Sequence, residues 1–140
     1  MRMRVLTQTS KGKMIAIADR LTKLIDADKA TDVIMPAYPC DGERLIIIVA
    51  TAKPNMPDSF CRFLRTISRN NTANIAFVID GTEENAKKIV DMAKTSNCHV
   101  IEDNILYVKG GLPFKFLKSV TAEEIAAVEK WVVEIRAAMV

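Results

Sequence analysis

Long hydrophobic runs and closely spaced cysteines are missing from this sequence. Its longest apolar run covers residues 45–50, far short of the roughly 18 apolar residues that suggest a membrane span, so we expect no membrane partner. The basic start of the chain turns polar too early for a secretory signal, which favours a cytoplasmic location. Cys40, Cys61 and Cys98 are widely separated, which is not typical of a disulfide framework or a zinc site.

A strong charge of either sign is missing as well. The 140 residues carry 20 lysines and arginines against 17 aspartates and glutamates, a net charge of +3. Because no nucleic-acid recognition motif accompanies these charges, we expect no nucleic-acid partner. No set of a nucleophile and an acid can be assembled around the single histidine, His99, so we expect it to be structural.

The sequence does contain short β-branched runs that alternate with helical patterns. Residues 45–49 and 75–79 are apolar at every position, as the central strands of a parallel sheet are. The other predicted strands cover residues 3–7, residues 33–35, and a last strand region in which residues 98–101 and 105–108 flank a break at 102–104.

Amphipathic helical patterns fill the intervals between these strands. Apolar side chains recur at helical spacing in segments that begin near Met14, Phe60 and Ala86. A fourth segment follows Thr121 and Glu124, which have the spacing of a capping box.

Strands that alternate with helices imply right-handed crossovers and a parallel sheet. The sequence therefore predicts one α/β domain over residues 1–140. We expect this domain to be a three-layer sandwich with a five-stranded parallel sheet of order 2-1-3-4-5. Residues 36–43 are too few for a crossover helix, so we expect a loop between the second and third strands.

Ligands of an open parallel sheet bind beyond the carboxyl ends of its strands, and the segment after the first strand is rich in polar groups. It runs from Thr7 through Gln8 to Lys13 and leads into a helix. Its hydroxyls, glycine, lysines and backbone amides suit an anionic phosphate. The alternative is that Thr9 or Ser10 only caps the helix while the lysines are solvated.

Three other classes of nucleotide-binding or signalling domain lack their motifs here. The chain has no G-x-G-x-x-G for a dinucleotide and no G-x-x-x-x-G-K-[ST] for a P-loop nucleotidase. A receiver domain would need acidic residues after the first strand and an aspartate after the third. The chain has Thr7-Gln8 and Thr51-Ala52 at these places.

The segment after the first strand resembles the phosphate loop of the flavodoxin family, [ST]-x-T-G-[NQ]-T-x-x-x-A. Thr9 and Gly12 fit this pattern, whereas Lys11, Lys13 and Met14 depart from it.

A second match to the flavodoxin family follows the third strand. Thr51 and Pro57 look like residues of that family, and Ala52 stands where an aromatic residue would stack on the flavin. The segment from Asp80 to Glu83 also lacks the usual aromatic residue. The tail, residues 109–116 followed by a capped helix, resembles the end of short flavodoxin-family proteins.

The resemblance implies a flavodoxin-like three-layer sandwich that binds flavin mononucleotide (FMN) for electron transfer to or from a reductase or oxidase. Met56 is either a cover for the flavin ring in place of an aromatic residue or an ordinary loop residue. The resemblance implies a cofactor site formed by Thr7, Thr9, Ser10, Lys11, Gly12, Lys13, Met14, Thr51, Ala52, Lys53, Met56, Asp80 and Gly81.

Charge is the feature that differs most from typical flavodoxins, which are acidic. Lys11, Lys13 and Lys53 flank the expected site. We therefore expect a partner with an acidic docking face and a less negative potential for the second electron.

Two other functions stay open. The altered phosphate loop and the missing aromatic residues also fit an interaction module that has lost flavin binding, for example a subunit that accompanies a reductase such as bilirubin reductase. A flavin-dependent reductase acting on its own substrate is the third possibility, although we identify no residues that would position a substrate. An electron carrier or accessory subunit is thus favoured over a free-standing enzyme.

Overall fold

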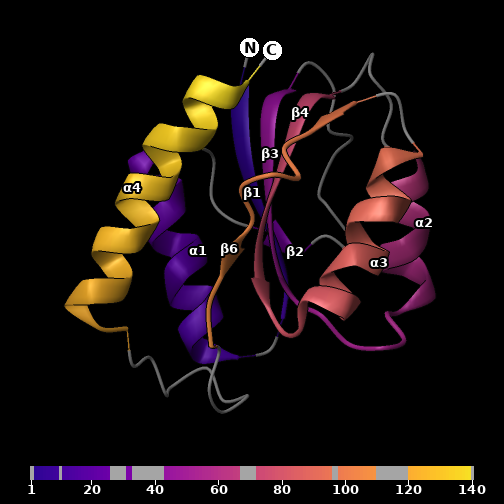
Figure 1. Cartoon of the computed structure of the whole chain (residues 1–140), viewed down its shortest axis with the longest axis horizontal. Helices are drawn as coiled ribbons and strands as arrows, with labels where there is room; N and C mark the ends of the chain where they lie inside the picture. Colours follow the sequence, from indigo (N-terminus) through magenta and orange to yellow (C-terminus); the bar gives the residue numbers. More distant parts are fainter. Residues whose placement is uncertain are drawn as a thin grey trace.

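The computed structural model describes residues 2–9, 11–25, 31–32, 43–66, 72–95, 98–109 and 120–139. In these ranges a parallel sheet is covered by helices on both faces (Figure 1). The strands are β1 (Arg2–Gln8), β2 (Thr31–Asp32), β3 (Glu43–Thr51), β4 (Thr72–Asp80), β5 (His99–Val100) and β6 (Leu106–Tyr107). The helices are α1 (Gly12–Leu24), α2 (Asp58–Thr66), α3 (Glu83–Lys94) and α4 (Ala122–Ala138).

All strand pairs of this sheet are parallel within the described ranges. β1 lies between β2 and β3, β3 pairs with β4, and both β5 and β6 pair with β4 on its other side. The predicted α/β class and parallel sheet are therefore confirmed. At the β4 edge, the single fifth strand of the prediction is replaced by two strands of two residues each. They flank the predicted break at 102–104.

The edge strand β2 lies directly before the strand that the sequence predicts over residues 33–35. The structure places Thr31 and Asp32 opposite Leu6 and Thr7 of β1. Residues 33–42, which hold the whole predicted strand and nearly all of the predicted loop, lie outside the described residues.

The central strands β3 and β4 are apolar on both faces, as predicted. Residues 45–50 and 75–79 are fully buried, because successive side chains of a strand point to opposite faces and both faces are covered. One face packs with α2 and α3 and the other with α1 and α4 (Figure 1).

The helix α4 begins and packs as its sequence pattern predicts. The Thr121 hydroxyl accepts from the Glu124 backbone N–H at 3.1 Å, and the Glu124 carboxylate accepts from the Thr121 N–H at 3.2 Å. Trp131 is buried, and its indole N–H donates to the Asn104 carbonyl at 2.7 Å. This bond joins α4 to the break between β5 and β6. No helix in the described ranges is long and apolar enough to cross a membrane.

Candidate functional site

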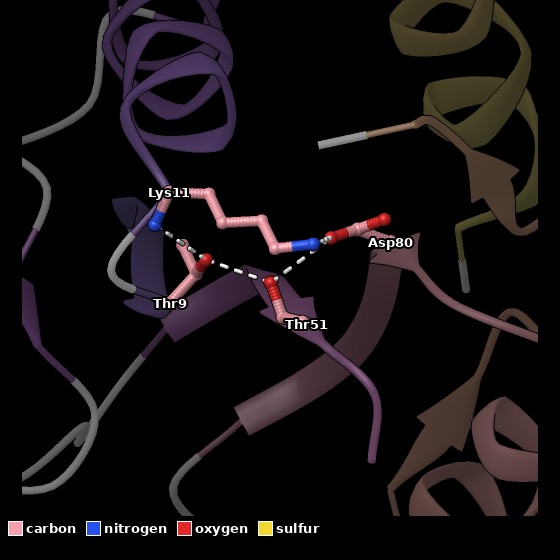
Figure 2. Close-up of polar contacts among 4 residues, drawn as sticks. All are labelled: Thr9, Lys11, Thr51 and Asp80. Atoms are coloured by element: carbon pink, nitrogen blue, oxygen red, sulfur yellow. Dashed lines mark hydrogen bonds and ion pairs between the residues drawn. The ribbon is translucent and has the colours of Figure 1, made fainter. Parts of the chain in front are cut away.

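The carboxyl ends of β1, β3 and β4 lie next to one another, and each is followed by a polar side chain or ends on one. The sheet register pairs Gln8 with Ala50 and Thr51 with Asp80. Thr9, Thr51 and Asp80 therefore stand beside one another across three neighbouring strands, and Lys11 completes the group at the start of α1 (Figure 2). We call Thr9, Lys11, Thr51 and Asp80 the edge cluster.

A chain of hydrogen bonds runs through the edge cluster. The Thr51 hydroxyl donates to Asp80 Oδ2 at 3.3 Å. The Thr9 hydroxyl lies 2.7 Å from that of Thr51, and either of these two hydroxyls can be the donor between them. Thr9 Oγ1 in turn accepts from the Lys11 backbone N–H at 3.2 Å.

The Lys11 side chain closes this chain into a ring. Its ammonium nitrogen lies 2.6 Å from Asp80 Oδ2, the same oxygen that accepts from Thr51 (Figure 2). The two side chains are only 26% and 12% exposed. The ion pair is thus partly shielded from water and is screened less than a pair on the open surface.

The first turn of α1 stands directly behind the edge cluster. Lys11 is the N-cap residue and makes no side-chain capping bond, whereas α3 and α4 are both capped by threonine hydroxyls. Gly12 is the first helical residue and is buried. Ser10, another predicted site residue, lies outside the described residues.

Two predicted site residues in this turn point away from the edge cluster. Met14 is fully buried and packs in the core between the sheet, α1 and α4. The Lys13 ammonium lies 2.7 Å from the Glu124 carboxylate at the start of α4. Both side chains therefore serve the packing of α1 against α4.

Glu124 is a charged residue at this corner that the sequence did not suggest as part of a site. Burial disfavours the ionised form of Glu124 and is the largest single influence on its pKa. The bonds that it accepts from Lys13 and from the Thr121 backbone nevertheless hold its pKa below the ordinary value. The capping-box pattern indicated its bond to Thr121, but nothing in the pattern indicated Lys13.

The loop after β3 packs closely against the end of β4. The Ala52 N–H donates to the Asp80 carbonyl at 2.8 Å, and the Ala52 side chain joins the core. Gly81 has a φ of +149°, and a Cβ on it would lie 2.9 Å from the Ala52 carbonyl oxygen. Ala52 and Gly81 therefore fix the position of Asp80 in the edge cluster.

The remaining predicted site residues lie around this loop and along β1. Lys53 is exposed, and its backbone N–H donates to the Met56 sulfur at 3.4 Å. Met56 is partly buried against the core on the α2 and α3 side. Thr7 is half-buried on β1 opposite Val49 of β3.

Gln8 is a further residue that sequence reasoning did not single out. Its Oε1 atom is buried and has no hydrogen-bond partner within the described part of the chain. A buried acceptor of this kind usually bonds to water, a ligand or another protein group. Its position at the end of β1, directly before Thr9, was the only signal that could have suggested it.

A cleft of about 340 Å³ lies elsewhere, along α3 and the segment that contains β6. It is lined by charged residues that include Lys87 and Asp91 and by Tyr107. Partial burial and the nearby Glu83 carboxylate raise the pKa of the Tyr107 hydroxyl. No residue of the edge cluster lines this cleft, so the two features are separate.

The edge cluster supplies donors of the kind that bind anions. Two hydroxyls, an ammonium group and the first-turn amides of α1 come together beside one carboxylate. No group of three or more histidine, cysteine, aspartate or glutamate side chains among the described residues is arranged to hold a metal ion.

Comparison with known proteins gives no assignment, because neither the family models nor the curated proteins contain a match to this chain. Its function therefore has to be inferred from the geometry at the carboxyl edge of the sheet.

Proposed function

We propose that this chain binds FMN at the edge cluster and acts as an electron carrier for a reductase partner. The observation that carries the proposal is the convergence of Thr9, Lys11 and Thr51 at the carboxyl ends of β1 and β3. The chain leaves β1 toward β2 on one side and returns to β3 on the other. In open parallel sheets, ligands bind at such a switch point.

The donor set fits the phosphate group of this cofactor. Phosphate oxygens accept charge-assisted hydrogen bonds from ammonium groups and bind at helix N-termini. Lys11 would supply the ammonium, and Gly12 would allow the backbone of α1 to approach closely. The sheet order 2-1-3-4-5 that we infer for the whole chain is the flavodoxin-like one, which favours FMN among phosphate ligands.

The ring of the flavin would lie against the loops after β3 and β4. Ala52 and Gly81 offer no aromatic face, so Met56 is the side chain that would contact the ring. Because a ring stack is worth about 0.5–1.5 kcal/mol beyond its area, we expect weaker binding than with stacked aromatic residues. The bound flavin would supply the electron-transfer chemistry, and the chain would bind and orient it.

Visible flavin absorbance tests this proposal. The purified protein is incubated with FMN, desalted and examined for bound flavin. We expect about one flavin per chain in the wild type and a clear loss in Thr9→Val, which lacks a hydroxyl of the edge cluster. Thr22→Val is the matched control, because the Thr22 hydroxyl bonds to the Ala18 carbonyl on α1. A colourless wild type, or equal loading of Thr9→Val and wild type, would contradict the proposal.

The lysines around the edge cluster indicate what kind of partner this carrier would bind. Lys53 is exposed at the loop after β3, whereas Lys11 and Lys13 each end on a carboxylate. We propose an acidic docking face on the reductase that meets Lys53. Association should then slow as the salt concentration rises, and Lys53→Glu should weaken it at low salt.

The second candidate function is an interaction module without a cofactor. It is favoured by the Lys11–Asp80 ion pair, which already satisfies the lysine that would meet a phosphate. Such a module could accompany a reductase as an accessory subunit. It predicts a colourless protein whose melting temperature is the same with and without FMN, whereas a binding ligand would raise that temperature.

A further inference from the structure

We infer that Asp80 is an internal competitor for the ligand of the edge cluster. Its carboxylate forms an ion pair with the Lys11 ammonium. An anionic ligand binds by replacing Asp80 as the partner of Lys11. The inference rests on the proposed function, because it concerns how the same cluster exchanges its own carboxylate for a phosphate group.

The contacts of Asp80 are those that a bound anion would make. One oxygen, Oδ2, lies 2.6 Å from the Lys11 ammonium and accepts from the Thr51 hydroxyl at 3.3 Å. Carboxylate and phosphate oxygens accept the same charge-assisted hydrogen bonds from an ammonium group. Asp80 therefore pairs with the Lys11 ammonium when no ligand is bound.

Asp80 is held in place, whereas Lys11 is free to reach a different partner. The Asp80 carbonyl accepts from the Ala52 N–H at 2.8 Å, and the next residue, Gly81, packs directly on Ala52. Lys11 carries its charge on a flexible four-carbon stem and is the more exposed partner, at 26% against 12%. The exchange therefore consists of the Lys11 side chain turning from Asp80 to the ligand.

This arrangement implies that Asp80 lowers the affinity of the edge cluster for anions, although it belongs to that cluster. The ligand must break the Lys11–Asp80 pair, and afterwards it stays close to an uncompensated carboxylate that repels it. Removing the Asp80 charge should thus strengthen anion binding. If Asp80 only supported the loop structure, its replacement would weaken binding.

The test is a set of titrations of wild type, Asp80→Asn, Lys11→Met and the double variant. Each protein is titrated with inorganic phosphate, followed by the amide NMR shifts of Gly12 and Lys13, and separately with FMN, followed by flavin fluorescence. We expect Asp80→Asn to bind both ligands roughly tenfold more tightly. In the Lys11→Met background, the same substitution should strengthen binding by clearly less than tenfold, since the competed ammonium is gone and only the repulsion by the Asp80 carboxylate is removed.

Asp91→Asn is the matched control for net charge. Asp91 is an exposed aspartate on α3 and is not part of the edge cluster, so its replacement should leave both affinities within about twofold of wild type. Asp80→Ser supplies the same comparison if the asparagine variant does not fold, as judged by circular dichroism.

The outcomes separate this inference from the proposed function. Tighter phosphate binding by Asp80→Asn without FMN binding by any variant would support the competitor role and reject the flavin carrier. FMN binding by the wild type with unchanged or weaker affinity in Asp80→Asn would overturn the competitor role alone. No binding of either ligand by any variant would overturn both.

Discussion

The Lys13 ammonium lies 2.7 Å from the Glu124 carboxylate and joins the first turn of α1 to the first turn of α4. Both side chains are mostly buried, at 16% and 24% exposed. The pair therefore holds α1, whose first turn adjoins the edge cluster, against the C-terminal helix α4.

This contact predicts a pH-dependent contribution to stability. Because the folded protein lowers the pKa of Glu124 from its usual 4.5, the contribution is fully present above that value. It is lost as the pH falls through the folded-state pKa. Glu124→Gln keeps the capping geometry but removes the charge, so we expect it to lower the free energy of unfolding by about 1 kcal/mol at pH 7. The difference from wild type should vanish in strong acid.

Urea unfolding at several pH values measures this effect, and a second α1–α4 ion pair provides the control. The Arg20 guanidinium and the Glu129 carboxylate lie 2.6 Å apart, but both side chains are about half exposed. Glu129→Gln should cost less than about 0.5 kcal/mol, because exposed pairs contribute little. Equal effects of the two substitutions at pH 7, or an effect of Glu124→Gln that persists in acid, would contradict the assignment.

Gly81→Ala should destabilise the fold. A Cβ at this position would lie 2.9 Å from the Ala52 carbonyl oxygen, and the φ of +149° is rarely adopted by residues with a side chain. We expect a loss of about 1–3 kcal/mol in urea unfolding. Asn55→Ala, at an exposed position of the neighbouring loop, should change stability by less than about 0.5 kcal/mol. If Gly81→Ala is as stable as wild type, the loop accommodates the added Cβ without cost, which would contradict this prediction.

How far the sequence predicts this fold depends on how local the signal is. The strands over 45–49 and 75–79 were predicted because burial on both faces leaves no polar position. The α4 capping box was predicted because its two residues are three apart. The pairing of Thr31 and Asp32 with β1 was not predicted, since two residues carry no periodicity to detect.

The sequence predicts at which edge of the sheet the candidate site lies, but it does not predict which side chains of the site contact one another. Strand order alone brings Thr9 near Thr51, because Thr9 follows β1 and Thr51 ends the adjacent parallel strand β3. Which carboxylate each lysine reaches depends on distances between elements far apart in the chain, and the pattern does not contain them. In the structure Lys11 and Lys13 each form an ion pair with a carboxylate, whereas the sequence pattern predicts that their charges act on the flavin.

Gly12→Asp should reduce FMN affinity at least about tenfold. The substitution adds a negative charge at the buried first residue of α1, where the phosphate would approach. Gly12→Ala adds bulk without charge and serves as the comparison, with a smaller loss expected. If a flavin fluorescence titration gives the same affinity for Gly12→Asp and wild type, the phosphate does not bind at α1.

Lys53 is now the lysine expected to influence the redox potential. Within the described ranges no carboxylate pairs with it, unlike Lys11 and Lys13. Lys53→Glu should therefore lower the midpoint potential for the second electron of bound FMN by roughly 10–30 mV at low salt and by less at high salt. Lys23→Glu, at the far end of α1, should leave it unchanged. Equal potentials for Lys53→Glu and wild type at low salt would show that this charge does not act on the flavin.

The most direct test of the account compares the affinity of the wild type for FMN with its affinity for riboflavin, which lacks the phosphate. We expect FMN to bind at least about tenfold more tightly, because only its phosphate can use the donors of the edge cluster. Lys11→Met should weaken FMN binding and leave riboflavin binding unchanged. Equal affinities for the two flavins, or no binding of FMN at all, would contradict the account.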